Sequence, residues 1–133
     1  MSADFDATFE LLCAMLRDHA EGLTVAEDSA NRFCLEAVPG LATLAAWGGK
    51  ARRPAIPVAW VERGKTYVGY HLMGLNGNSA LVDRLSDGLK ARMQGKTCFN
   101  FRRASEAPLD ELNEVTAASI AALRRAGYVA RND

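Results

Sequence analysis

The run IPVAWVERGKTYVGYHLM, residues 56–73, restricts the possible folds of this chain more than any other segment. Apolar and polar side chains alternate on both sides of Arg63 and Gly64, which is typical of two strands joined by a tight turn. A two-residue loop predicts that Trp60 lies opposite Tyr67, whereas a longer loop would change the pairs but not the alternation. The predicted core face carries Ala59, Val61, Thr66, Val68, Tyr70 and Leu72. The predicted outer face carries Trp60, Tyr67, Gly69 and His71.

A second alternating run, KTCFNF at residues 96–101, predicts another strand. Its core-facing side chains are Thr97, Phe99 and Phe101. Its other face carries Lys96, Cys98 and Asn100. Before it, an apolar stripe at steps of four predicts a helix that Gly95 terminates, with Ser79 and Ser86 as N-caps of its pieces. The members of that stripe are Leu81, Leu85, Leu89 and Met93.

The remaining segments predict helices at both ends of the chain. An amphipathic helix begins at Asp4 or Asp6 and ends before Gly22, and a second runs from Pro108 to Gly127. Residues 23–26 and 32–36 alternate as a strand pair around a polar turn. The run GLATLAAW at residues 40–47 fits a strand or a short helix, and we predict a strand.

These elements predict one domain over residues 1–133 with an α+β fold, a two-layer sandwich. We expect a mainly antiparallel sheet of about five strands, with the N-terminal and C-terminal helices packed on one face. Lysine and arginine together number 16, as do aspartate and glutamate, which disfavours binding to nucleic acid or an anionic membrane. The apolar runs are too short to cross a bilayer, and three cysteines with no close pair suggest reduced thiols in the cytoplasm.

The outer sheet face supplies the candidate ligand-binding site, provided that the strand of KTCFNF lies beside that of VGYHL. Its members are Trp60, Lys65, Tyr67, His71, Lys96, Cys98 and Asn100. A lysine there could hold a carboxylate or a phosphate. Cys98 beside Lys96 would have a lowered thiol pKa if partly exposed, but with no base identified we favour a buried, inert thiol. His71 could equally be a structural histidine.

The segments KTYVGYHLM, LKARMQGKTCFNF and AGYV resemble small bacterial proteins of the YdhG-like family, a domain of unknown function, and the likeness covers most of the chain. The resemblance implies a frataxin-like fold and a role as an intracellular iron chaperone. Frataxin-type iron binding uses an acidic first helix, which implies Asp4, Asp6 and Glu10 as the metal ligands here. Asp6 and Glu10 share one helix face at i and i+4.

Three functional hypotheses follow. The first is a YdhG-like protein that binds a ligand or iron on the open sheet face. The second is a non-catalytic interaction module that docks a partner, or a second copy of itself, through Trp60 and Tyr67. The third is an enzyme that uses His71 or Cys98 and therefore requires a deep pocket around one of them. We favour them in this order, and expect no catalysis.

Overall fold

The computed structural model describes residues 2–130, so the predicted domain extends beyond the described residues at both ends. A six-stranded antiparallel sheet has the strand order β1-β2-β3-β4-β6-β5. The strands are β1 (Thr24–Asp28), β2 (Arg32–Ala37), β3 (Ile56–Arg63), β4 (Val68–Leu72), β5 (Met93–Gln94) and β6 (Cys98–Phe101). The α+β prediction is therefore confirmed, with one strand more than the five expected.

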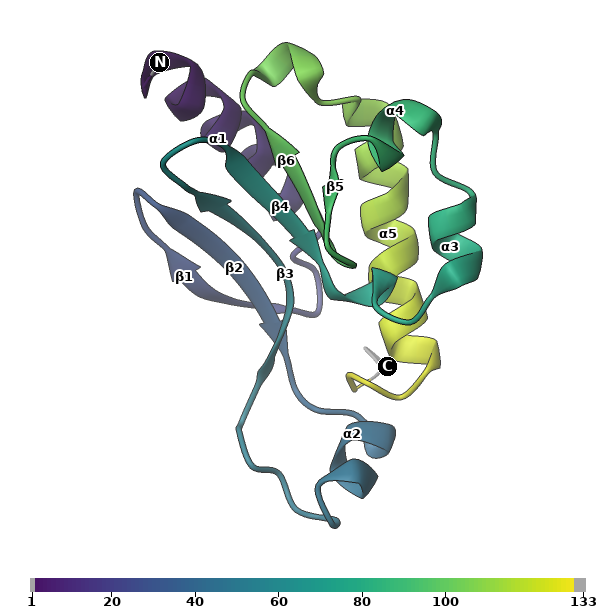
Figure 1. Ribbon diagram of the computed structural model, residues 1–133. Coiled ribbons are helices and arrows are strands. Elements are labelled where there is room, and N and C mark those ends of the chain that lie inside the picture. Colours follow the sequence, from purple (N-terminus) through teal and green to yellow (C-terminus); the bar gives the residue numbers. More distant parts are fainter. Residues whose placement is uncertain (1, 131–133) are drawn as a thin grey trace.

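The two long helices are α1 (Ser2–Arg17) and α5 (Leu109–Arg125). In Figure 1, α1 passes behind β4 and β6, and α5 lies on the β5 side of the sheet. Shorter elements connect the strands: α2 (Leu41–Ala46), η1 (Met73–Leu75), α3 (Ser79–Asp83), α4 (Asp87–Lys90) and η2 (Ala104–Glu106). Leu12 and Leu16 of α1 and Leu112 of α5 are fully buried, as expected for helices that cover an apolar sheet face. No helix within residues 2–130 combines the length and the apolar character needed to cross a membrane.

Alternation in the strands sorts the core side chains as predicted. Val68, Tyr70 and Leu72 of β4 and Phe99 and Phe101 of β6 have no exposed surface. The Tyr70 hydroxyl lies 2.5 Å from that of Thr116 on α5, and Thr116 also donates to the carbonyl of Leu112 at 2.7 Å. The buried hydroxyl of Tyr70 is therefore hydrogen-bonded to the helical layer through Thr116.

The predicted register of the β3–β4 hairpin is wrong. Trp60 lies opposite His71 and Arg63 opposite Val68, so four residues, 64–67, separate the paired strands instead of two. Thr66 is consequently an exposed loop residue and not a core residue. Trp60 lies opposite a residue four positions further along β4 than predicted. Because side chains point to the same face at every second residue, a shift of four leaves the other predicted core and outer residues on their predicted faces.

The strand predicted at residues 40–47 is also wrong, because this segment forms helix α2. Figure 1 shows α2 away from the sheet, at the end of the arms that leave β2 and enter β3. Five of its six residues are alanine or leucine, which have the highest helix propensities, and the run has no apolar alternation for a sheet to bury. Gly48 and Gly49 follow with φ of 82° and 96°.

Three predicted helix boundaries need correction. Asp4 and Asp6 lie inside α1, which begins at Ser2, so neither is its N-cap. The Asn78 side chain caps α3 through the Leu81 amide, whereas Ser86 caps α4 as predicted. The last helical turn ends at Lys90, and Gly95, with φ of 77°, lies in the turn between β5 and β6.

Candidate functional site

A single row of paired residues crosses the outer face of the sheet. It runs through all six strands as Glu27, Cys34, Trp60, His71, Cys98 and Gln94. The neighbouring row contains Arg32, Glu62, Gly69 and Asn100. The strands of VGYHL and KTCFNF are thus adjacent, which was the condition for the predicted site.

Trp60 and His71 form a stacked pair at the centre of this row. Their ring centroids are 4.6 Å apart and the ring planes differ by 9°. The guanidinium carbon of Arg32 lies 5.6 Å from the Trp60 ring, within the range of a cation–π contact. Both rings are therefore held in place by neighbouring side chains, and the imidazole is fixed over the sheet.

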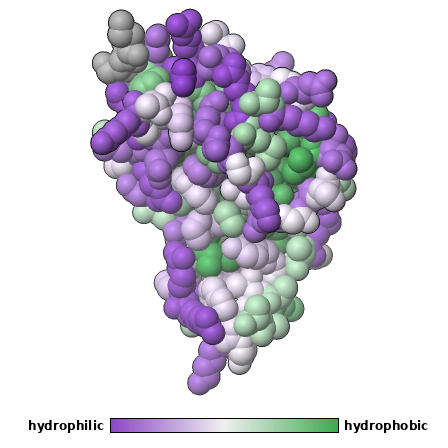
Figure 2. Space-filling model, in the orientation of Figure 1, coloured by the Kyte–Doolittle hydropathy of each residue, from purple (hydrophilic) through white to green (hydrophobic). Residues whose placement is uncertain are grey.

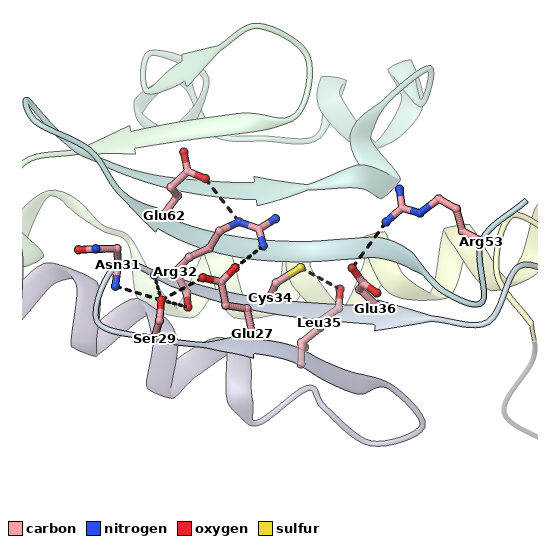
Figure 3. A network of polar contacts seen from close by, with 9 residues as sticks. All are labelled: Glu27, Ser29, Asn31, Arg32, Cys34, Leu35, Glu36, Arg53 and Glu62. Atoms are coloured by element: carbon pink, nitrogen blue, oxygen red, sulfur yellow. Dashed lines mark hydrogen bonds and ion pairs between the residues drawn. The ribbon is translucent and has the colours of Figure 1, made fainter.

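An ion-pair network covers the half of the face formed by β1, β2 and β3 (Figure 3). Arg32 pairs with Glu27 at 3.0 Å and with Glu62 at 3.4 Å. Cys34 lies beneath this network and is completely buried. Hydrogen bonding to Arg32 and Ser29 lowers the pKa of Glu27, so the Glu27 carboxylate is charged at neutral pH.

A cavity of about 250 Å³ occupies the other half of the face. It is lined by Glu62, Gly64, Tyr67, Gly69, His71, Gln94, Cys98 and Asn100. Gly69 lies between Glu62 and Asn100 and forms part of the cavity wall. A side chain at this position would enter the cavity, because a Cβ there would lie 3.0 Å from His71 Nε2 and 3.3 Å from Cys98 Sγ. The cavity thus depends on Gly69, a glycine in the row next to that of His71 and Cys98.

Cys98 and His71 contact each other inside this cavity. The Cys98 Sγ lies 3.4 Å from His71 Nε2 and 3.2 Å from the amide oxygen of Asn100, to which the thiol donates. Burial raises the pKa of Cys98 to about 11, outweighing a backbone hydrogen bond from Tyr70, which lowers it. Burial also lowers the pKa of His71. At neutral pH the pair is a thiol and a neutral imidazole.

This geometry bears on two sequence-based interpretations of Cys98. Lys96 does not lower the thiol pKa, because Lys96 is exposed in the β5–β6 turn and desolvation dominates, which agrees with the inert thiol favoured above. The absence of a nearby base is wrong, because His71 lies within contact distance. A neutral thiol beside a neutral imidazole can donate and accept hydrogen bonds, but it has little thiolate for nucleophilic attack.

We expect alkylation of Cys98 by iodoacetamide at pH 7 to be ~100-fold slower than that of an ordinary thiol, because its pKa of about 11 leaves less thiolate. The rate should rise with pH until about that value. Peptide mass spectrometry would separate Cys98 from the more buried Cys13 and Cys34. If Cys98 were alkylated at pH 7 as fast as a free cysteine, Cys98 and His71 would not both be neutral.

The predicted site residues do not all meet in the cavity. Tyr67, His71, Cys98 and Asn100 line it, and Trp60 supports His71. Lys65 instead lines an adjoining hollow of about 480 Å³ together with Arg32, Arg63 and Glu62. Lys96 lines neither. The cation expected to hold an anionic group is therefore absent from the wall around His71 and Cys98.

Two lining side chains, those of Glu62 and Gln94, were not identified from the sequence. Glu62 was not assigned to the predicted outer face, and Gln94 was placed in the helix that Gly95 was predicted to terminate. The sequence did carry a signal for a strand at Gln94. Gly95 lies three residues before β6 and fits the turn of a β-hairpin as well as the end of a helix.

The acidic residues implied as metal ligands lie on α1, away from this row. Asp6 forms an ion pair with Arg63, whereas Asp4 and Glu10 are exposed. Within the described part of the chain, no group of three or more His, Cys, Asp or Glu side chains is arranged to hold a metal ion.

Comparison with known protein families, curated proteins and solved structures finds no match to this chain. The YdhG-like resemblance stays a prediction.

Proposed function

We propose that this protein binds a small planar molecule bearing hydrogen-bond donors, in the cavity on the open sheet face. The observation that carries the proposal is the cavity beside Gly69, enclosed by His71, Cys98 and Asn100. Its volume of about 250 Å³ lies just below the usual range for small-molecule pockets, ~300–1,000 Å³, which suits a ligand of one or two rings.

The polarity of the lining supports a neutral or cationic ligand. Glu62 is the charged side chain among the lining residues, and its carboxylate can only accept hydrogen bonds. The amides of Gln94 and Asn100 both donate and accept, and the neutral His71 supplies one of each. A ring with amino or N–H groups matches this set, whereas an anionic ring would place its charge near Glu62.

The protonation of the Cys98–His71 pair supports binding without covalent chemistry. Nucleophilic cysteines have lowered pKa values, and that of Cys98 is raised to about 11. Docking of a partner through Trp60 is less well supported, since its ring already packs against His71 and Arg32. Iron delivery, a homodimer and a cytoplasmic, bacterial YdhG-like identity remain predictions.

The test is an amide NMR titration with adenine, which carries amino and N–H donors, and with orotate, an anionic planar ring. We expect saturable shifts at Tyr67, His71 and Asn100 with adenine, and at least ~10-fold weaker binding of orotate because its carboxylate is repelled by Glu62. Shifts that do not saturate, or that lie away from these residues, would contradict the proposal.

Substituting valine for Gly69 should remove adenine binding, with at least a ~10-fold loss of affinity, because its side chain fills the cavity beside His71 and Cys98. Gly69→Ala is a milder variant that should weaken binding and retain the fold. Gly88→Ala is the matched control, since the nearest atom to its added Cβ is the Ser86 hydroxyl at 4.0 Å. Equal adenine affinity in Gly69→Val and Gly88→Ala would refute the assignment of the cavity.

A further inference from the structure

A second candidate site lies at the end of the molecule that carries α2, away from the sheet cavity. There the segment at residues 38–42 pairs with the segment that follows α5, through a bridge between Pro39 and Val129. The amides of Gly40 and Ala42 donate to the carbonyls of Tyr128 and Gly127, each at 3.0 Å. The Thr43 hydroxyl also donates to the Tyr128 carbonyl, at 2.6 Å. These bonds hold α2 against the end of α5.

A groove of about 570 Å³ lies along this junction and is mainly apolar. Its lining consists of Pro39, Gly40, Leu41, Ala42, Leu44, Arg124, Arg125, Ala126, Gly127, Val129 and Ala130. Leu41 is 84% exposed and neighbouring Val38 is 61% exposed, so two large apolar side chains at this end of the molecule are open to solvent. Figure 2 shows pale and green surface at this lower end, beside a strongly hydrophilic edge.

The charged residues that line the groove, Arg124 and Arg125, have one sign, although the whole chain is neutral. Residues 38–55 and 117–130 contain no aspartate or glutamate. Their charged residues are Lys50, Arg52, Arg53, Arg124 and Arg125. Arg53 reaches Glu36 at 3.9 Å, whereas neither Arg124 nor Arg125 forms an ion pair with any residue in 2–130. The apolar groove is therefore flanked by two arginines without a carboxylate partner in the described part of the chain.

Arg124 carries a second sign of an incomplete site. Its Nε atom is buried and has no hydrogen-bond partner within the described residues, whereas its Nη2 donates to the Glu21 carbonyl at 3.3 Å. Buried donors in proteins are nearly always paired, and a guanidinium is suited to a carboxylate. The Nε has no accessible surface, so a ligand bound in the groove would contact the Nη groups of Arg124, which lines the groove.

We propose that this groove binds an apolar carboxylate, a small molecule with a hydrocarbon chain and one anionic end. The chain packs against Leu41, Leu44 and Val129, and the carboxylate accepts hydrogen bonds from Arg124. A small inorganic anion would leave the apolar lining exposed, and an uncharged apolar molecule would leave the guanidinium unpaired. The site is separate from the sheet cavity and does not rest on the function proposed there.

The experiment titrates the full chain with octanoate, 1-octanol and acetate and follows amide NMR shifts. We expect saturable shifts at Ala42, Gly127 and Val129 with octanoate, at least ~10-fold weaker binding of octanol, and no saturation with acetate. Equal affinities for octanoate and octanol would overturn the role of Arg124. The absence of saturable octanoate shifts at these residues would overturn the site.

Two variants separate the anionic and apolar contacts. Arg124→Gln should weaken octanoate at least ~10-fold and leave octanol unchanged, whereas Leu41→Ser should weaken both and, because Leu41 is 84% exposed, should retain the fold. Arg102→Gln, an exposed arginine after β6, is the control and should change neither affinity. Octanoate affinity in Leu41→Ser equal to that of the control would overturn the proposal even if Arg124→Gln fails to fold.

Discussion

Replacing Phe99 by alanine is expected to lower the free energy of unfolding by about 3–5 kcal/mol, the usual cost of removing a buried phenylalanine ring. Phe99 has no exposed surface and lies in β6 between Tyr70 of β4 and Met93 of β5. Its ring belongs to the apolar layer that α1 and α5 cover. Because small domains unfold at only ~5–15 kcal/mol, this loss is a large part of the total.

Urea unfolding of the two proteins measures the effect of Phe99→Ala directly. Tyr67→Ala is the matched control, because Tyr67 is an aromatic residue next to β4 but 38% exposed, and its loss should cost less than ~1 kcal/mol. If Phe99→Ala does not fold, Phe99→Leu should still do so, with a loss near 1–2 kcal/mol. A cost below ~1 kcal/mol for Phe99→Ala would show that this ring does not anchor the core.

The face of each strand residue was predictable because it depends on a local rule. Side chains alternate every residue, so Tyr70 and Phe99 were assigned to the core and His71 and Cys98 to the outer face without knowledge of the register. The register itself depends on the conformation of the hairpin loop. Residues 64–67 offered more than one turn, and the shorter one was predicted.

The cavity was only partly predictable, because its walls come from strands that are distant in sequence. The outward direction of His71, Cys98 and Asn100 followed from alternation, but their proximity required β4 and β6 to be neighbours. Gln94 was missed because an apolar step of four at Leu85, Leu89 and Met93 continues the helical pattern beyond the last helical turn.

The protonation states were only partly predictable, because they depend on burial: an inert Cys98 thiol was favoured, but its contact with a neutral His71 was not foreseen. Lys96 and Arg102 lie within four residues of Cys98 in the sequence and would lower the pKa of a water-exposed thiol. In the folded chain both cations are exposed and the thiol lies half-buried against His71, so desolvation decides the sign of the shift. A charge close in sequence is a poor guide to a pKa unless its distance and exposure are known.

The second large effect is expected for Gly74→Ala, which should lower the free energy of unfolding by about 3 kcal/mol or more. Gly74 lies in η1, where the chain leaves β4 and passes against α5, and its amide donates to the Ser119 hydroxyl at 3.0 Å. A Cβ at this position would lie 2.2 Å from the Ser119 carbonyl oxygen and 2.4 Å from its Oγ. Backbone atoms on the buried face of a helix cannot move away as a flexible side chain can.

Thermal or urea unfolding tests this prediction, and Gly88→Ala serves as control because the nearest atom to its added methyl is the Ser86 hydroxyl, at 4.0 Å. Ser119→Ala should cost about 1–3 kcal/mol, since it leaves the Gly74 amide buried without a partner. The double variant Gly74→Ala, Ser119→Ala separates the two causes. It should remain nearly as unstable as Gly74→Ala, because the closest atom is the backbone oxygen of residue 119, which no substitution there removes. If the double variant were as stable as the unsubstituted protein, the strain would come from the Ser119 hydroxyl. The backbone of η1 would then be able to move away from α5.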